Sequence, residues 1–286
     1  TYAKYGLPSQ SLEDWRRSNV DSLVQNVHRT IKKHKPWVQF GISPFGVWKN
    51  KSTDPMGSDT KAGQTTYEDL FADPVLWVQE GWLDYLAPQV YWSMDYPVAS
   101  HKTITSWWDQ HTPNTNLYIG NGTYKIKNNA DKAWDKNNEI PKQLNFAREL
   151  DHIDGNIFFS AKSLIGQHKK VNEKLQKKYY RLPAENPGPL NKVVREVQLP
   201  AIKSVQLNEQ ILTICVNHTD EIPRFLNLYT SKKEKHQLVG KQYISESDME
   251  GCYQFQLTKK QLRNDIQINV SDAYGNESAM LPLNVN

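Results

Sequence analysis

The sequence predicts an α/β unit followed by an all-β unit, and three observations support this division. All 9 tryptophans lie before residue 135. Residues 181–190 contain three prolines and a glycine, which fit neither a helix nor a central strand. Strand-like runs alternate with helical patterns before this stretch, whereas the apolar period after residue 193 is two. We therefore expect two domains, at 1–182 and 193–286, with the boundary near 182–192.

The first long element is an amphipathic helix that begins near Ser11 and ends before Pro36. Ser11 and Asp14 have the spacing of a capping box. Apolar residues then recur with the helical period, at Val20, Leu23, Val24, Val27 and Ile31. This pattern predicts a helix of about six turns with one apolar face.

Four apolar runs follow this helix, and each run precedes a helical pattern. The runs are 37–42, 83–92, 116–120 and 155–160, and the helical patterns are about 67–81, 103–111, 141–151 and 163–179. Strands joined by a helix return in parallel through a right-handed crossover. Four such units fit a small open α/β sheet or half of a (β/α)8 barrel. We favour the barrel, because polar and aromatic residues follow the strand ends, where barrels build their sites.

The segment after residue 193 has the pattern of half-buried antiparallel strands. Apolar residues alternate over 211–216 and 252–257, further short runs lie at 225–229 and 266–270, and 274–277 reads as a turn. About seven short strands are the number found in an immunoglobulin-like sandwich. Cys215 and Cys252 fall on the polar phase of their strands. We favour two free thiols, and a bridge between neighbouring strands is the alternative.

Composition excludes several functional classes. Lys+Arg 35 against Asp+Glu 31 leaves a net charge of +4 without a basic stripe, so we expect no binding to nucleic acid or to an acidic membrane surface. No apolar run reaches the roughly 18 residues of a membrane span. Two cysteines without metal-ligand spacing, and the lack of phosphate and dinucleotide motifs, predict neither metal nor cofactor. Because the chain begins at Thr1, we expect that an upstream segment was removed.

The strand ends supply candidate ligand-binding residues. Aromatic rings stack on the C–H faces of sugars, while amides and hydroxyls bind sugar hydroxyls. Candidates of this kind are Phe45, Trp48, Trp92, Asn121, Tyr124 and Ser160. Gln89 joins them, because an unpaired amide inside an apolar strand costs about 1–3 kcal/mol and must find a structural partner or a ligand. The alternative is that the aromatic residues only fill gaps between helices and sheet.

Acidic residues test whether the unit is a complete enzyme. Glycoside hydrolysis usually needs two carboxyl groups about 5–10 Å apart. Only Asp95 stands just past a strand end, which makes it the one candidate catalytic residue, with a turn before Pro97 as its alternative role. Asp54 and Asp59 have the surroundings of solvated turn residues, and Asp84 precedes its strand. We therefore expect one acid where two are needed.

Several long strings resemble the glycosyl hydrolase-like 10 (DUF187) family. They are Trp15-Arg-Arg-Ser-Asn-Val20, Val38-Gln-Phe-Gly-Ile-Ser-Pro-Phe-Gly-Val-Trp48, Gly81-Trp-Leu-Asp-Tyr-Leu-Ala-Pro-Gln-Val-Tyr-Trp92 and Trp107-Trp108. The resemblance covers residues 1–181, and the rest resembles a fibronectin type III-like domain. It implies a (β/α)8 barrel whose fourth strand ends in an Asp-Asp-Tyr type motif, which this chain lacks. It also implies a substrate-groove role for a set of five residues, namely Phe45, Trp48, Gln89, Tyr91 and Trp92.

The resemblance places the four strands as the C-terminal half of the barrel, with the catalytic carboxylates upstream of Thr1. Half a barrel exposes two strand edges, so we expect it to be completed by the N-terminal half, by a second copy, or by other segments that cover the edges. The expected function is a secreted or surface-anchored bacterial glycoside hydrolase acting on a polysaccharide such as cell-wall glycan, inactive as this chain alone. The alternatives are a noncatalytic carbohydrate-binding protein and an interaction module in which the sandwich does the work.

Overall fold

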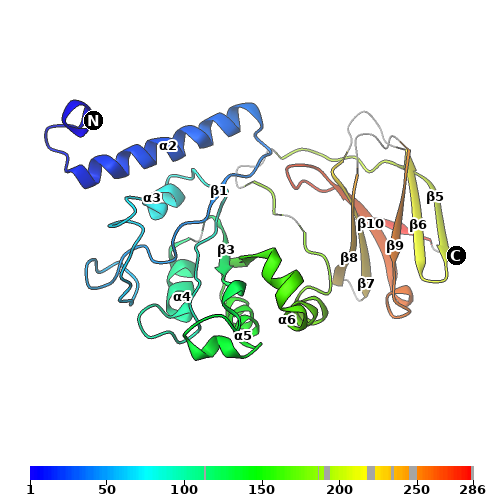
Figure 1. Ribbon diagram of the computed structural model, residues 1–286. Helices are drawn as coiled ribbons and strands as arrows, with labels where there is room; N and C mark the ends of the chain where they lie inside the picture. Colours follow the sequence, from blue (N-terminus) through cyan, green and yellow to red (C-terminus); the bar gives the residue numbers. More distant parts are fainter. Residues whose placement is uncertain are drawn as a thin grey trace. The chain divides into compact units, whose positions relative to one another are not determined.

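The computed structural model divides the chain after Tyr179, into a unit with a parallel sheet and a unit with antiparallel sheets (Figure 1). The structure describes residues 1–112, 114–185, 187–189, 194–217, 223–232, 235–244 and 250–284. Within the predicted linker, Asn186 and 190–192 lie outside these residues, as does Val193 at the predicted start of the sandwich. In the described ranges, no helix has the length and apolar character needed to cross a bilayer.

The N-terminal helices are α1 (Tyr2–Tyr5) and α2 (Leu12–His34). Helix α2 confirms the predicted helix, since the Ser11 hydroxyl accepts a hydrogen bond from the Asp14 backbone N–H at 3.0 Å. Val24 on its inner face is buried, whereas Leu23 is 63% exposed. Part of the apolar stripe is therefore left uncovered by this chain.

The parallel sheet has the order β1-β2-β3-β4, as predicted from the alternating pattern. Its strands are β1 (Gly41–Ile42), β2 (Tyr85–Leu86), β3 (Asn116–Asn121) and β4 (Ile153–Phe158). The first two are shorter than predicted, because Pro44 and Pro88 have no N–H to donate to a ladder. Pairing resumes beyond them as isolated bridges from Gln89 to Phe45 and to Gly120.

Short helices connect the strands. They are α3 (Pro74–Gln79), α4 (His101–His111), α5 (Glu139–Ala147), α6 (Lys169–Lys174), the 3-10 helices η1 (Thr123–Lys125) and η2 (Lys132–Asp135), and the π-helical turns η3 (Ser163–Gln167) and η4 (Leu175–Tyr179). The prediction of one helix over 67–81 was wrong: the helix begins at Pro74, where the Asp73 carboxylate accepts the Leu76 N–H. The predicted helix 163–179 is divided into η3, α6 and η4.

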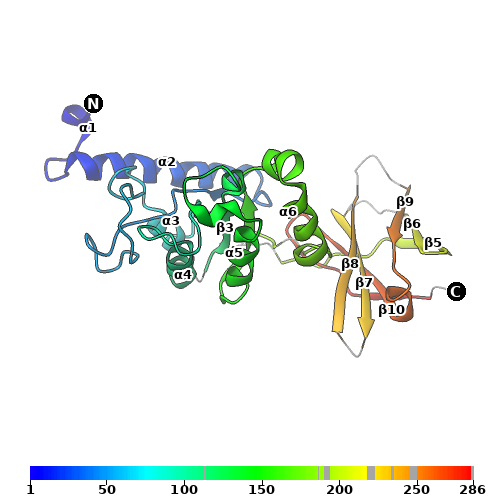
Figure 2. The ribbon, with the colours of Figure 1, turned by 60° about the horizontal axis from the view of Figure 1, so that its bottom comes forward.

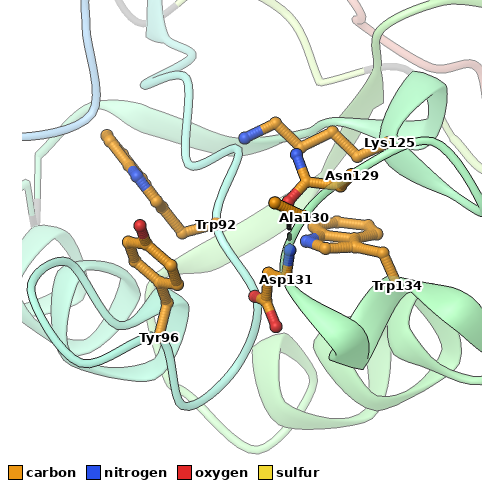
Figure 3. Close-up of a pocket in the computed structure, with 7 residues that line it drawn as sticks. All are labelled: Trp92, Tyr96, Lys125, Asn129, Ala130, Asp131 and Trp134. Carbon is orange, nitrogen blue, oxygen red and sulfur yellow. Dashed lines mark hydrogen bonds between the residues drawn. The ribbon is translucent and has the colours of Figure 1, made fainter.

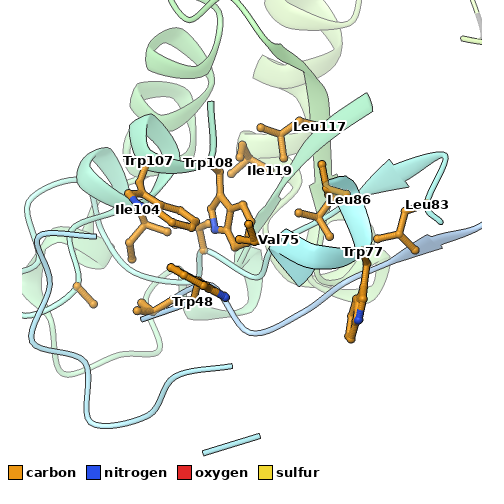
Figure 4. Close-up of a cluster of buried hydrophobic side chains, with 14 of the residues drawn as sticks. Trp48, Val75, Trp77, Leu83, Leu86, Ile104, Trp107, Trp108, Leu117 and Ile119 are labelled. Atoms are coloured by element: carbon orange, nitrogen blue, oxygen red, sulfur yellow. The ribbon is translucent and has the colours of Figure 1, made fainter. Parts of the chain in front are cut away.

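One face of the parallel sheet carries the core of the first unit (Figure 4). Leu86, Leu117 and Ile119 are fully buried on this face, against side chains of α2, α3 and α4. The described residues of the first unit cover the opposite face only in part. Side chains of that face that remain partly or fully exposed are Ser43, Tyr85, Gln89, Tyr91, Tyr118, Ile157 and Phe159.

The second unit has two antiparallel sheets, of order β11-β10-β7-β8 and β5-β6-β9 (Figure 2). The strands are β5 (Ala201–Asn208), β6 (Ile211–Asn217), β7 (Phe225–Lys232), β8 (Lys235–Tyr243), β9 (Glu250–Gln256), β10 (Asp265–Ser271) and β11 (Leu281–Leu283), with a 3-10 turn η5 (Gln261–Arg263). The predicted alternation is confirmed, since Leu212, Ile214 and Val216 are buried in the core that both sheets share.

Cys215 and Cys252 form a disulfide, so the favoured expectation of two free thiols was wrong. The two residues lie directly opposite each other on β6 and β9, with their Cα atoms 4.0 Å apart. The sequence pattern placed each cysteine among the polar positions of its strand but did not show which strands are neighbours. The cysteines meet because β6 and β9 are adjacent and antiparallel in this register.

Candidate functional site

A cavity of about 360 Å³ lies beyond the carboxyl ends of β2 and β3. It is lined by Trp92, Tyr96, Lys125, Asn129, Ala130, Asp131 and Trp134. Trp92 and Tyr96 form one side, and Lys125, Asn129 and Trp134 form the other (Figure 3). Aromatic walls with a few polar groups between them are typical of small-molecule sites.

The loop after β3 places one wall of this cavity. Trp134 lies in η2, is 1% exposed and packs in a second apolar cluster with Ile140 and Leu144 of α5. Lys125 ends η1, directly after the sheet. The apolar cluster therefore holds Trp134 in place, and Trp134 and Lys125 both line the cavity.

Asp131 fixes the loop to the end of β2. One of its carboxylate oxygens accepts the Ala133 N–H at 3.0 Å and so caps η2, and the other accepts the Ser93 hydroxyl at 2.5 Å. The Asn129 side chain in turn accepts the Asp131 N–H at 2.9 Å. Both oxygens of this carboxylate therefore already have donors.

Among the described residues that line the cavity, Lys125 is the one with a cationic side chain. Partial burial lowers the pKa of its ammonium, and the charge of Asp131 opposes this shift. In the described ranges, its ammonium has no hydrogen bond and no ion pair. The ammonium lies over the Tyr124 ring, 6.0 Å from its centroid, and Asp131 is the acid among the described lining residues that acts on it.

An aromatic group made of Tyr91, Tyr124 and Phe159 lies at the same end of the sheet. The Tyr91 and Phe159 rings are stacked, with centroids 5.9 Å apart, and Tyr124 meets both edge-on at 6.0 and 5.8 Å. Phe159 is 56% exposed and Tyr124 37%. Burial, followed by the neighbouring Tyr124, raises the pKa of the Tyr91 hydroxyl, which therefore remains a neutral hydrogen-bonding group.

Other predicted residues surround these two features. Phe45 packs edge-on against Trp92, with centroids 5.4 Å apart. The partly exposed Gln89 has a structural partner, because its amide donates to the Ser43 carbonyl at 2.9 Å. Ser160 is partly exposed, and its carbonyl accepts the Ser163 hydroxyl.

Trp48 and Asn121 lie elsewhere, on the helix side of the sheet. Trp48 is 6% exposed, donates to Asp73 at 3.0 Å and stacks on Trp107. Asn121 is fully buried between Gln143 and Asn156 side chains, with both hydrogen bonds at 2.8 Å. The structure does not bring these two residues to the surface that holds Gln89 and Tyr91.

The acidic residues near the cavity serve different purposes. Asp95 is exposed in a turn and has no hydrogen bond or ion pair with the residues that the structure describes. Glu139, which the sequence analysis did not single out, is 1% exposed and accepts the Met94 N–H at 2.7 Å. In the same ranges, no group of three or more His, Cys, Asp or Glu side chains is arranged to hold a metal ion.

Six lining residues escaped the sequence analysis, namely Tyr96, Lys125, Asn129, Ala130, Asp131 and Trp134. Five of them lie in the segment from 125 to 134, just after the candidate residues Asn121 and Tyr124. The Asn-Ala-Asp run at 129–131 is a capping signal for a short helix, and it could have drawn attention to this loop.

Comparison with known proteins places these features in a family context. The chain is 44% identical over 186 residues to glycosyl hydrolase YngK of Bacillus subtilis, which covers 64% of this chain and 36% of YngK. It is 43% identical over 166 residues to glycosyl hydrolase DigH of Escherichia coli K12, covering 56% of this chain and 38% of DigH. The alignments thus span little more than a third of these relatives' length. The model of the glycosyl hydrolase-like 10 family matches residues 1–136, which confirms the resemblance for this part of the chain.

Proposed function

We propose that residues 1–179 contribute the substrate groove of a glycoside hydrolase that acts on a polysaccharide, with bacterial cell-wall glycan as the preferred candidate. The cavity between Trp92 and Trp134 carries this proposal. Two indole rings, the phenol of Tyr96 and the amide of Asn129 provide apolar faces and directional polar groups, which a pyranose ring needs. The exposed group of Tyr91, Tyr124 and Phe159 extends the surface on which further sugar units could stack.

We further propose that the parallel sheet is the C-terminal half of a (β/α)8 barrel. In an open doubly wound sheet, helices cover both faces, whereas in a barrel they cover only the outer one. Here the core of α2, α3 and α4 lies on one face, and residues such as Tyr85 and Tyr118 on the other face stay partly exposed. The completing partner would be the N-terminal half of the barrel or a second copy of this chain.

The catalytic carboxylates would come from the completing part. Asp131 is the one acid in the lining within the described part of the chain, and both of its oxygens accept hydrogen bonds from internal donors. Asp95 remains a candidate only as a secondary group, because it is exposed and outside the lining. This assignment agrees with alignments that cover 36–38% of the relatives.

The second unit fits a fibronectin type III-like sandwich in an exported protein. A three-stranded sheet facing a four-stranded sheet is the arrangement of such sandwiches. The Cys215–Cys252 disulfide favours an oxidising compartment, which supports a secreted or surface-anchored location.

A noncatalytic carbohydrate-binding protein is the second candidate. The occupied carboxylate of Asp131 favours it, since an acid that already accepts two hydrogen bonds is poorly placed to transfer protons to a substrate. The two candidates share the cavity and differ only in turnover.

A chimera separates them. The 186 aligned residues of YngK are replaced by their counterparts from this chain, and release of reducing ends from purified cell-wall glycan is measured. We expect release by the chimera and none by this chain alone, with Trp92→Ala, at a partly exposed tryptophan of the cavity lining, abolishing binding. The matched control is Trp37→Ala, a tryptophan 36% exposed and outside the cavity. A chimera that binds glycan but releases no reducing ends would support the noncatalytic carbohydrate-binding protein instead of the glycoside hydrolase.

A further inference from the structure

We propose that helix α5 sets the spacing between the two walls of the cavity, and that Glu139 and Gln143 are positioning residues for Trp92. The inference rests on the proposed function and concerns how the same cavity keeps its shape. Both side chains are buried, and neither is among the residues that line the cavity. They act on the segment from Trp92 to Tyr96, which carries one of the two walls (Figure 3).

Side chains of α5 take over from strand pairing along this segment. The pairing of β2 with its neighbours ends in the isolated bridges of Gln89. Three residues later, the Gln143 amide donates to the Trp92 carbonyl at 3.1 Å, and the Glu139 carboxylate accepts the Met94 N–H at 2.7 Å. A buried backbone group without a partner is costly, so these two hydrogen bonds hold the backbone on both sides of residue 93 in one place.

The hydrogen bonds of Gln143 run in one direction, which fixes how its amide is turned. Its nitrogen donates to Glu139 at 3.1 Å as well as to the Trp92 carbonyl, and its oxygen accepts from the Asn121 amide at 2.8 Å. The Asn121 oxygen in turn accepts from the amide of Asn156 on β4 at 2.8 Å. An ionised carboxylate only accepts hydrogen bonds, so Glu139 at the end of this chain sets the orientation of each amide before it.

The neighbouring side of the same helix holds the opposite wall. Ile140 and Leu144 each follow a member of the polar pair by one residue, and both are buried in the apolar cluster that contains Trp134. Residues four apart lie together on one face of a helix. Helix α5 therefore presents a polar pair to the backbone of Trp92 and an apolar pair to Trp134, so the separation of the two indole rings is set before a sugar binds.

A purely structural role is the competing explanation, and it makes a different prediction. Removing the polar pair would then lower stability but leave the place of Trp92 and the sugar affinity unchanged. The geometry favours positioning, because the hydrogen bonds end on the backbone of the wall itself, at the Trp92 carbonyl and the Met94 N–H.

Fluorine NMR of the full chain labelled with 5-fluorotryptophan reports on Trp92 directly. The Trp92 resonance is assigned by its loss in Trp92→Phe. Gln143→Leu has a similar volume and removes the hydrogen bonds to Trp92, Glu139 and Asn121. We expect the Trp92 resonance to shift, and the affinity for soluble fragments of purified cell-wall glycan to fall about tenfold, as for the loss of one well-placed interaction.

Glu139 offers a matched pair of substitutions. Glu139→Gln keeps an acceptor oxygen for both donors and should retain the resonance and the affinity, whereas Glu139→Leu should behave like Gln143→Leu. Thr105→Val is the control. Thr105 is fully buried in α4, and its hydroxyl has no hydrogen bond with the residues that the structure describes, so neither readout should change.

The outcomes separate the positioning role from the proposed function. An unchanged Trp92 resonance and glycan affinity in Gln143→Leu and Glu139→Leu would overturn the inference and leave the sugar site intact, as would an equal shift in Thr105→Val. If Gln143→Leu and Glu139→Leu do not fold, Asn156→Ala at the partly exposed end of the chain decides in the same way, with a smaller shift expected. Failure of the unchanged protein to bind glycan would overturn the proposed function, and the Trp92 resonance would still test the positioning role.

Discussion

The two ends of the parallel sheet differ in how a lysine is paired with an acid. At the amino end, the Asp84 carboxylate receives the Lys32 ammonium at 2.6 Å and the Phe40 N–H at 2.7 Å, and Asp154 receives the Leu117 N–H at 2.8 Å. At the carboxyl end, Lys125 has no such partner in the described ranges. Charged pairs at the amino end stabilise the unit, whereas the Lys125 ammonium at the carboxyl end borders the cavity.

The largest effect that can test this comparison is expected at Lys32. Lys32→Met leaves the 3%-exposed Asp84 without its cation, and removing one partner of a buried pair costs about 3–5 kcal/mol. Urea denaturation measures the free energy of unfolding, and sugar binding by the folded fraction should not change. Lys33→Met, one residue along on the exposed side of α2, is the control. Equal stability of the two variants would show that the amino end is not the stabilising end.

Lowering the pH should decrease the free energy of unfolding of the first unit, because His101 near the carboxyl end of the sheet is buried. Burial lowers the pKa of this fully buried imidazole to about 4, against a weaker opposing effect of its hydrogen bond with the Val90 carbonyl. The unfolded chain binds the proton near pH 6.5, so stability is complete above that pH and is lost as the pH falls toward 4, by about 3 kcal/mol. Unfolding free energies at a series of pH values measure the loss.

His101→Gln provides the comparison for this pH series. The variant keeps a polar side chain but cannot take up a proton, so its stability should fall less between about pH 6.5 and 4 than that of the unchanged protein. Parallel pH profiles for the two proteins would assign the acid sensitivity to other groups.

The smallest effect on stability is expected at Tyr124. This side chain is 37% exposed and meets Tyr91 and Phe159 edge-on, so Tyr124→Ala should lower the unfolding free energy by about 1 kcal/mol. Glycan affinity should fall about threefold to tenfold if the aromatic group stacks sugar. Tyr5→Ala is the control, with a ring 63% exposed on α1. Unchanged glycan affinity for Tyr124→Ala would limit the binding surface to the cavity.

Local signals in the sequence predicted the elements more securely than the site. Helix α2 follows from Ser11 and a regular apolar repeat, and the parallel order follows from the alternation of strands and helices. Trp48 and Trp92 are both tryptophans that come just after a strand. Trp48 nevertheless lies in the core, whereas Trp92 lines the cavity. That difference depends on how the loop after β1 packs against α4, which is a tertiary contact without a local signature.

The same limit explains the loop that the sequence analysis overlooked. Asp131 resembles a solvated loop acid in the sequence, and its role appears only when Ser93, 38 residues earlier, comes within hydrogen-bond distance. Asn121 shows the reverse case. It is the last residue of β3, where a sugar-binding amide could lie, but side chains from α5 and β4 use both of its polar atoms.

The disulfide between β6 and β9 can be reduced chemically, and this changes only the second unit. Its sulfurs are the only ones from cysteine in the sequence, so a thiol reductant changes covalent structure in Tyr180–Asn286 and nowhere in Thr1–Tyr179. Titration with dithiothreitol would therefore divide any measured property of the chain, whether adhesion to a surface or retention of a sugar, between the two units without a single substitution.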